Sequence, residues 1–273
     1  MTVCLGALCA DADGNAARAI VVVSDRMVTL GNITEFEHEV PKIQVITDNL
    51  VALTAGDALR GFRLIKEVMT ALPKDVIDVE QIVSSTAKRY SELRKRQIES
   101  DVFQKRNMNI NDFYRSGIQH QMVSALAGAI DKYVDEYDFG LELMMAGIDD
   151  SGAHLYSIEN PGDVYSEHLP IGYHAIGSGT LHALQSMIGF GHTAARGLHE
   201  TIFAVYASKR RAEFAPGVGR DTDMMVISKD GVTKIEGDVL AQLEQVYAAD
   251  YLQPVRQETK DKLDEISFFG GEK

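Results

Sequence analysis

The order in which strand-like and helix-like periods follow one another constrains the fold of this chain most. Four short apolar runs bounded by turn residues come first, at residues 2–10, 18–24, 42–47 and 50–55, and each predicts a strand. Apolar residues then recur at helical spacing over 57–72 and about 79–96, with Pro73 ending the first of these helices. The chain therefore opens with four strands and continues with two helices.

The second half repeats this grouping. Strands are predicted at 142–149, at 153–159 and in a stretch that ends at 175–176, followed by helices at about 180–188 and 193–212. A closing hairpin at 223–228 and 232–236 turns at Asp230-Gly231, and a last helix covers about 238–252. Strands and helices grouped in this way predict an α+β fold of two packed sheets covered by helix pairs, rather than alternating βαβ units.

The length of the chain is enough for one large globular domain or two small ones. The 273 residues are 45% hydrophobic and 25% charged, which is enough to form a substantial core. We expect this domain to span 1–253 and the charged segment 254–273 to be a peripheral tail. No apolar run has the length of a membrane span, and the start lacks the pattern of a signal peptide.

Charge and cysteine placement restrict the partners and the location. A formal charge of −13 disfavours nucleic acid and anionic membranes as partners. Cys4 and Cys9 are five residues apart on one predicted strand, so they should point to opposite faces and form no disulfide together, which favours a reducing cytoplasm. The histidines lack metal-ligand spacing and the glycines lack a dinucleotide-binding pattern, so we expect neither a metal nor a cofactor.

Thr2, directly behind Met1, is the first candidate functional residue. Removal of Met1 would leave a threonine hydroxyl and a free α-amine on the same residue. An α-amine has an ordinary pKa near ~8, so it can act as a base at neutral pH. A threonine hydroxyl with such a base in reach is an activated nucleophile. A threonine at the second position is also a common start, so the context has to decide.

Four further signals lie where predicted strands begin or end. Asp25 follows the second strand in SDRMVT, and Lys42 opens the third in PKIQVI. Gly56 lies in LTAGDA and Ser178 in AIGSG, both at a strand-to-helix junction. Taken singly, each has a structural explanation: an exposed strand end, a tight turn or an N-cap. A glycine at such a junction can also expose its backbone N–H to a developing oxyanion.

In this order and spacing, these segments resemble the β-type subunits of the proteasome family, including the bacterial HslV-type peptidases, within the N-terminal nucleophile hydrolases. The similarity runs from Thr2 to about Glu236, and the segments ELMMAGID and DMMVISKDG resemble the core strands of the family. The resemblance implies a four-layer αββα sandwich. It also implies a cytoplasmic threonine endopeptidase that assembles into rings and cleaves peptides or unfolded proteins, and it leaves an ATPase partner open.

The resemblance further implies a role for each candidate residue. Thr2 would be the nucleophile, Lys42 the catalytic lysine, Asp25 the acid that pairs with it, Gly56 the oxyanion donor and Ser178 the serine near the α-amine, with Gly179 and Asp221 as supporting residues. Catalysis would proceed through an acyl-enzyme ester on Thr2.

Three departures from the family pattern are visible, the first being a longer hairpin around Asp13-Gly14. Residues 98–139 have the appearance of an insertion, with a loop at 107–111 and a partly helical stretch at 118–137. In the loop 213–222, Ala215 and Val218 occupy the positions where the family carries an Asp and a Ser. Two alternative functions therefore stay open: a non-catalytic structural ring subunit, and an N-terminal nucleophile amidase that acts on a small amide.

Overall fold

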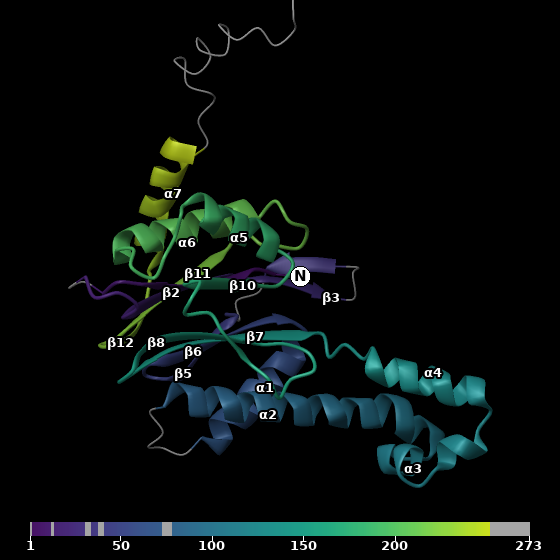
Figure 1. The fold of residues 1–273 in the computed structure, drawn as a ribbon. Helices are drawn as coiled ribbons and strands as arrows, with labels where there is room; N and C mark the ends of the chain where they lie inside the picture. The colour runs from purple at the N-terminus through teal and green to yellow at the C-terminus, as the bar shows by residue number, and fades with distance from the viewer. Residues whose placement is uncertain (1, 12–13, 31–33, 38–40, 73–77, 252–273) are drawn as a thin grey trace, which may run out of the picture. The chain divides into compact units, whose positions relative to one another are not determined.

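A computed structural model describes residues 2–11, 14–30, 34–37, 41–72 and 78–251 (Figure 1). Its contacts divide the chain into one compact unit over Met1–Lys234 and a second over Ile235–Lys273. The second unit contains helix α7 (Gly237–Tyr251), close to the predicted 238–252. Pro73 and the tail predicted at 254–273 lie outside the described residues.

Two five-stranded antiparallel sheets form the centre of the first unit. The first sheet has the order β10 (Tyr173–Ile176), β1 (Cys4–Cys9), β2 (Ala19–Asp25), β11 (Thr222–Ser228) and β12 (Gly231–Lys234). The second has the order β5 (Ile43–Thr47), β6 (Leu50–Gly56), β7 (Leu141–Asp149), β8 (Gly152–Ile158) and β9 (Ser166–Glu167). The predicted α+β class and most predicted strands are confirmed.

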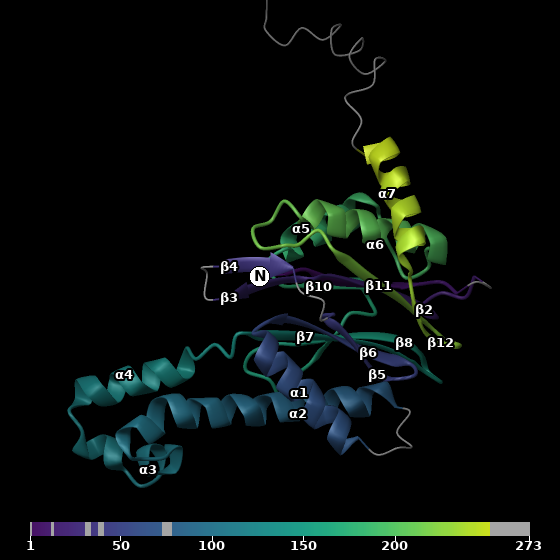
Figure 2. The ribbon, with the colours of Figure 1, turned by 180° about the vertical axis from the view of Figure 1, so that it is seen from behind.

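Helices cover the outer face of each sheet (Figures 1 and 2). Helices α1 (Ala58–Ala71) and α2 (Val79–Ile98) lie against the second sheet, and α5 (Thr180–Gly189) and α6 (Leu198–Ala212) lie against the first. Asp57 and Asp78 cap the first pair by accepting hydrogen bonds from backbone N–H groups of the first turn. Helix α6 begins five residues later than predicted, at Leu198.

Strand β7 shows why the sheets form the core. Met144 and Ala146 point into the apolar layer between the two sheets, whereas Leu143 and Met145 point into the layer under α1 and α2. A strand covered on both faces needs apolar residues at successive positions. Cys4 and Cys9 divide in the same way, since Cys4 lies between the sheets and Cys9 faces Thr201 of α6. Both are free thiols.

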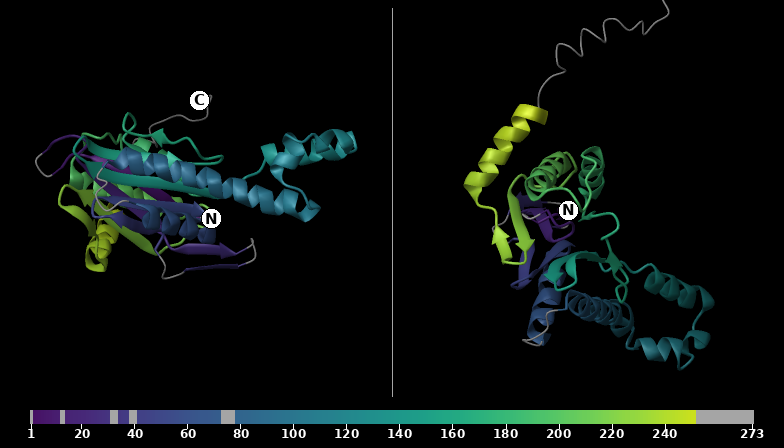
Figure 3. Two further views of the ribbon diagram at one scale, coloured as in Figure 1. Left: turned by 90° about the horizontal axis from the view of Figure 1, so that it is seen from below. Right: turned by 60° about the vertical axis from the view of Figure 1, so that its left-hand side comes forward.

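The predicted insertion forms a helical arm that extends beyond the sheets (Figure 3). Beyond α2 it contains a π-helical turn (Glu99–Phe103), α3 (Ile110–Tyr114) and α4 (Ser124–Asp135), joined by two short 3₁₀ turns. The loop predicted at 107–111 ends early, because Asn109 and Asp112 form a capping box that starts α3 at Ile110.

The hairpin that follows β2 and the short strand β9 were not predicted. The segment that follows β2 forms a two-stranded hairpin of β3 (Met27–Leu30) and β4 (Thr34–Glu37). Helices that are long and apolar enough to cross a membrane do not occur among the described residues.

Candidate active site

Thr2 lies two residues before the start of β1, the strand next to the edge of the first sheet. Its backbone is held by the turn between β10 and α5: the Thr2 N–H donates to Ser178 Oγ at 3.1 Å, and the Gly179 N–H donates to Thr2 O at 3.0 Å. Only 2% of Thr2 is exposed. These two hydrogen bonds fix the backbone of Thr2 independently of the contacts that its side chain makes.

Asp25, the last residue of β2, is a hydrogen-bond partner of the Thr2 hydroxyl. Its Oδ1 accepts hydrogen bonds from the Val3 N–H at 3.0 Å, from Lys42 Nζ at 2.8 Å and from the Thr2 hydroxyl. Its Oδ2 accepts from the N–H groups of Met27 and Gly219 at 3.0 and 2.9 Å. Asp25 is completely buried, so these five donors replace the water that a carboxylate would otherwise bind.

Lys42 completes a triangle with Asp25 and Thr2. Its backbone is anchored because the Thr54 N–H donates to Lys42 O at 3.2 Å, and its Nζ donates both to Asp25 Oδ1 and to Thr2 Oγ1. The Lys42 side chain is 14% exposed. Lys42 donates to the hydroxyl while the hydroxyl donates to Asp25, so one hydroxyl lies between a cation and an anion.

Gly56 ends β6 two residues beyond Thr54. Its φ is +97°, and a Cβ there would collide with the carbonyl oxygen of Gly140, so only glycine fits. Thr54 donates toward Lys42, and Asp57 donates to Gly140 O at 2.8 Å on the opposite side. Because N–H directions alternate along an antiparallel strand, the Gly56 N–H turns to the Lys42 side.

The turn that carries Ser178 approaches Thr2 closely. Gly177 has a φ of +91°, and a Cβ on it would lie 2.5 Å from Thr2 O. A Cβ on Gly179 would also lie 2.8 Å from Val3 Cβ. Ser178 Oγ lies within 3.3 Å of Thr2 O and 3.4 Å of Pro216 O. The two glycines therefore permit the contacts that Ser178 and Gly179 make with Thr2.

The loop before β11 contributes backbone rather than side chains. Ala215 and Val218 are buried, and Gly219 supplies its N–H to Asp25. Asp221 is directed to the β3–β4 hairpin, where its N–H donates to Glu37 Oε1 at 3.0 Å. A carboxyl–carboxylate hydrogen bond with Glu37 raises the pKa of Asp221. Of the predicted site residues that carry side chains, the structure thus brings together Thr2, Asp25, Lys42 and Ser178, with Asp221 on the hairpin side.

Two polar residues near the site were not predicted. Lys209 of α6 is completely buried and donates to Glu213 Oε1 and Arg220 O, both at 2.7 Å; burial lowers its pKa, against the attraction of Glu213. Glu142 of β7 accepts a hydrogen bond from the Gly177 N–H at 2.7 Å. In the sequence, Glu142 stands out only as an acidic residue at the start of a mostly apolar predicted strand.

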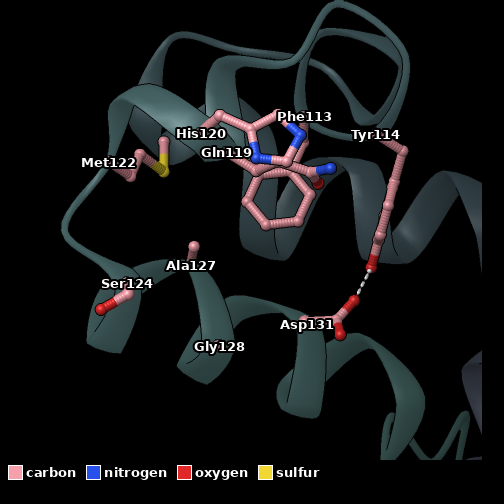
Figure 4. Close-up of a pocket in the computed structure, with 9 residues that line it drawn as sticks. All are labelled: Phe113, Tyr114, Gln119, His120, Met122, Ser124, Ala127, Gly128 and Asp131. Carbon is pink, nitrogen blue, oxygen red and sulfur yellow. Dashed lines mark hydrogen bonds between the residues drawn. The ribbon is translucent and has the colours of Figure 1, made fainter.

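The arm contains a second candidate site of a different kind (Figure 4). A cleft of about 530 Å³ opens between α4 and the segment before it, with Phe113 and Met122 on one side and Ala127 and Gly128 on the other. One end is closed by a hydrogen bond from the Tyr114 hydroxyl to Asp131 at 2.8 Å. The cleft lacks the linked nucleophile and charges found around Thr2, so the site at Thr2 is the stronger candidate for chemistry.

Comparison with known proteins assigns no family, because no family model and no curated protein matches the chain. Within the described residues, no three His, Cys, Asp or Glu side chains group as metal ligands would. The contacts around Thr2 are therefore the basis for any chemistry assigned to this chain.

Proposed function

We propose that this chain is an N-terminal threonine peptidase with the four-layer αββα fold of the N-terminal nucleophile hydrolases. The observation that carries this proposal is the Thr2 hydroxyl, which is hydrogen-bonded to both Lys42 Nζ and Asp25 Oδ1. A nucleophile, a cation and an orienting carboxylate in mutual contact are typical of activated hydroxyls. The sequence of layers, helices on each side of two facing sheets, is consistent with such a fold (Figure 1).

The proposed reaction begins when the Thr2 hydroxyl attacks a peptide carbonyl. The ammonium of Lys42 favours loss of the hydroxyl proton through its positive field, and Asp25 holds that ammonium in place. Once Met1 is removed, the Thr2 nitrogen would be a free α-amine 3.1 Å from Ser178 Oγ. That amine would accept the proton, transfer it to the leaving amine and later activate the water that hydrolyses the ester on Thr2.

Gly56 is the proposed oxyanion donor. Its N–H turns to the Lys42 side of β6, where the carbonyl attacked by Thr2 would develop negative charge. One such donor is worth roughly 3–4 kcal/mol of transition-state stabilisation in other hydrolases. Because the backbone has a φ of +97° here, this position should be sensitive to substitution.

The proposal includes a homo-oligomer of many subunits in the cytoplasm, with peptides or unfolded proteins as substrates. Exposed apolar side chains support the assembly: Leu59 and Phe62 on α1 are 84% and 52% exposed, and Leu181 and Ile188 on α5 are 64% and 66% exposed. We propose subunit contacts on the helices predicted at 57–72 and 193–212. The residues of α6 are largely buried, so α5 adds exposed apolar side chains to this surface. An ATPase partner remains part of the proposal only through the resemblance.

A non-catalytic ring subunit is the alternative that one observation favours. Ala215 and Val218 carry no carboxylate or hydroxyl, and the hydrogen bond from Ser178 to that loop goes to the backbone oxygen of Pro216. This alternative predicts that the Thr2 triangle is only structural. An amidase acting on a small amide would use the same triangle, and differs in the substrate that it accepts.

The intact mass of the purified protein, before and after treatment with a threonine-directed electrophile, tests these functions. We expect a mature chain that begins at Thr2 and takes up one equivalent of electrophile. Thr2→Ala should abolish both labelling and peptide hydrolysis while leaving assembly unchanged. Retention of Met1 in active protein, or equal hydrolysis by the wild type and Thr2→Ala, would contradict the mechanism. Labelling of Thr2 with turnover of small amides alone would favour the amidase.

A further inference from the structure

Glu142 occupies an unusual position for a carboxylate. It lies on β7 two residues before Met144, so it shares the face that points into the apolar layer between the sheets. Its cross-strand partner on β6 is Ala55, which is buried in the same layer. Glu142 is half-buried on this face, so its carboxylate loses part of its water and a specific partner compensates for that loss.

The partner of Glu142 belongs to the opposite sheet. Glu142 Oε2 accepts a hydrogen bond from the Gly177 N–H at 2.7 Å. A side chain of the second sheet therefore holds the turn that follows β10 of the first sheet. Ser178 and Gly179 in that turn are the residues that hold the nitrogen and the carbonyl of Thr2. Two hydrogen bonds, joined by the turn that contains Gly177 and Ser178, therefore link the Glu142 carboxylate to the backbone of Thr2.

The charge of Glu142 also reaches the site. The Cys4 thiol beside Thr2 has its pKa raised, mainly by burial; Lys42 opposes this, while Asp25 and Glu142 add to it. Asp25 at the end of β2, Lys42 before β5 and Glu142 on β7 are thus the charged groups that face this part of β1. Glu142 is therefore a second negative charge beside Asp25, and the nearby cations are Lys42 and the buried Lys209 of α6, which interacts with Asp25.

We propose that Glu142 is a positioning residue that fixes the Gly177–Gly179 turn, and through it the α-amine of Thr2, and whose negative charge sets the pH range in which that amine acts as a base. This inference rests on the proposed function and extends it to control of the site by pH. The carboxylate of Glu142 favours the protonated α-amine, so its removal should favour the neutral, basic form.

The test compares Glu142→Ala with Glu142→Gln, since glutamine keeps the acceptor oxygen and removes only the charge. We expect Glu142→Ala to lower kcat by roughly 10–100-fold with little change in KM, because the turn is misplaced. Glu142→Gln should keep kcat within about threefold but move the ascending limb of the pH–rate profile down by about half a pH unit. Glu159→Gln is the matched control, because it removes an exposed carboxylate at the end of β8 that does not bond to Gly177.

Two readouts do not need turnover, so they separate this inference from the proposed function. Hydrogen exchange of the Gly177 N–H should accelerate at least about tenfold in Glu142→Ala and stay slow in Glu142→Gln. The pH dependence of α-amine carbamoylation by cyanate, read on the N-terminal peptide, should shift in Glu142→Gln and not in Glu159→Gln. If wild type is inactive and unlabelled, the proposed function fails while these two readouts still decide on Glu142. If the Gly177 exchange and the amine titration are unchanged in both Glu142 variants, the inference is wrong.

Discussion

Lys42 is the residue whose loss should affect both chemistry and stability. Its ammonium is the cationic partner of Asp25, which is completely buried. Lys42→Ala should abolish peptide hydrolysis and lower the free energy of unfolding by about 3–5 kcal/mol, because an unpaired buried charge remains. Urea unfolding monitored by circular dichroism measures the loss. A decrease of less than about 1 kcal/mol would mean that the backbone donors satisfy Asp25 without Lys42.

Two glycines offer a matched pair of substitutions to alanine. Gly56 has a φ of +97° and no room for a Cβ, whereas a Cβ added to Gly128 on α4 would meet no atom within 4 Å. Gly56→Ala should therefore lower the unfolding midpoint and any hydrolysis, while Gly128→Ala should raise stability by about 0.4–1 kcal/mol. Thermal unfolding of both variants checks the pair. Equal midpoints for Gly56→Ala and the wild type would show that the β6–α1 junction can relax.

At the scale of elements, a histidine pair links the two sheets. His168, which follows β9, stacks on His174 of β10 with ring centroids 3.8 Å apart and planes within 5°. Burial lowers the pKa of both, that of His174 to about 4, and the neighbouring His168 adds to the effect. In the unfolded chain these rings have the ordinary pKa near ~6.5. At a pH between these two pKa values, the His174 imidazole is protonated in the unfolded chain but neutral in the folded protein. Protonation therefore favours the unfolded state.

Stability should consequently decrease as the pH falls from about 6.5 toward 4, by at most about 1.4 kcal/mol per pH unit for one ring. The measurement is the free energy of unfolding in urea at pH 7.5 and at pH 5. His174→Phe keeps an aromatic ring in the stack and removes the titration, so the difference between the two pH values should become smaller. An identical difference in wild type and His174→Phe would assign the acid sensitivity to other groups.

The elements that the sequence predicted are those with long, regular apolar periods. Strands β1, β2, β5–β8 and β11 and helices α1, α2, α5 and α7 lie within a few residues of their predicted ranges. The β3–β4 hairpin was missed because MVTL and TEFE are short and follow no apolar alternation. Such an element is specified by what it contacts, here through Glu37 and the loop before β11, rather than by its own period.

The residues of the candidate site also divide into those that the sequence predicted and those that it did not. Thr2, Asp25, Lys42 and Ser178 were predicted from strand ends and from a family resemblance, and they lie in contact. Glu142 and Lys209 were not predicted, because an isolated charge in a strand or in the last turn of a helix usually lies at the surface. Only the three-dimensional structure shows that one crosses to the other sheet and that the other is completely buried.

At the scale of the whole molecule, the exposed apolar residues of α1 and α5 predict self-association. A chain of 30.0 kDa should sediment as a much larger particle at micromolar concentration. Phe62→Glu on α1 should shift the distribution to smaller species, because a charge at an apolar contact is not compensated. Val164→Glu, at a residue that is 71% exposed outside these helices, is the control. Analytical ultracentrifugation distinguishes the two, and a monomeric wild type would contradict the ring assembly.

The placement of Thr2 has a consequence for the order of events during synthesis. The contact between the Thr2 nitrogen and Ser178 joins residues 176 positions apart, so Ser178 leaves the ribosome long after Thr2. At ordinary rates of translation this delay is about 10–35 seconds. Throughout that interval β1 lacks its partner β10, and the chain terminus stays open to an aminopeptidase. If Met1 is removed as we propose, we expect its removal to be a co-translational step, completed before the fold encloses Thr2.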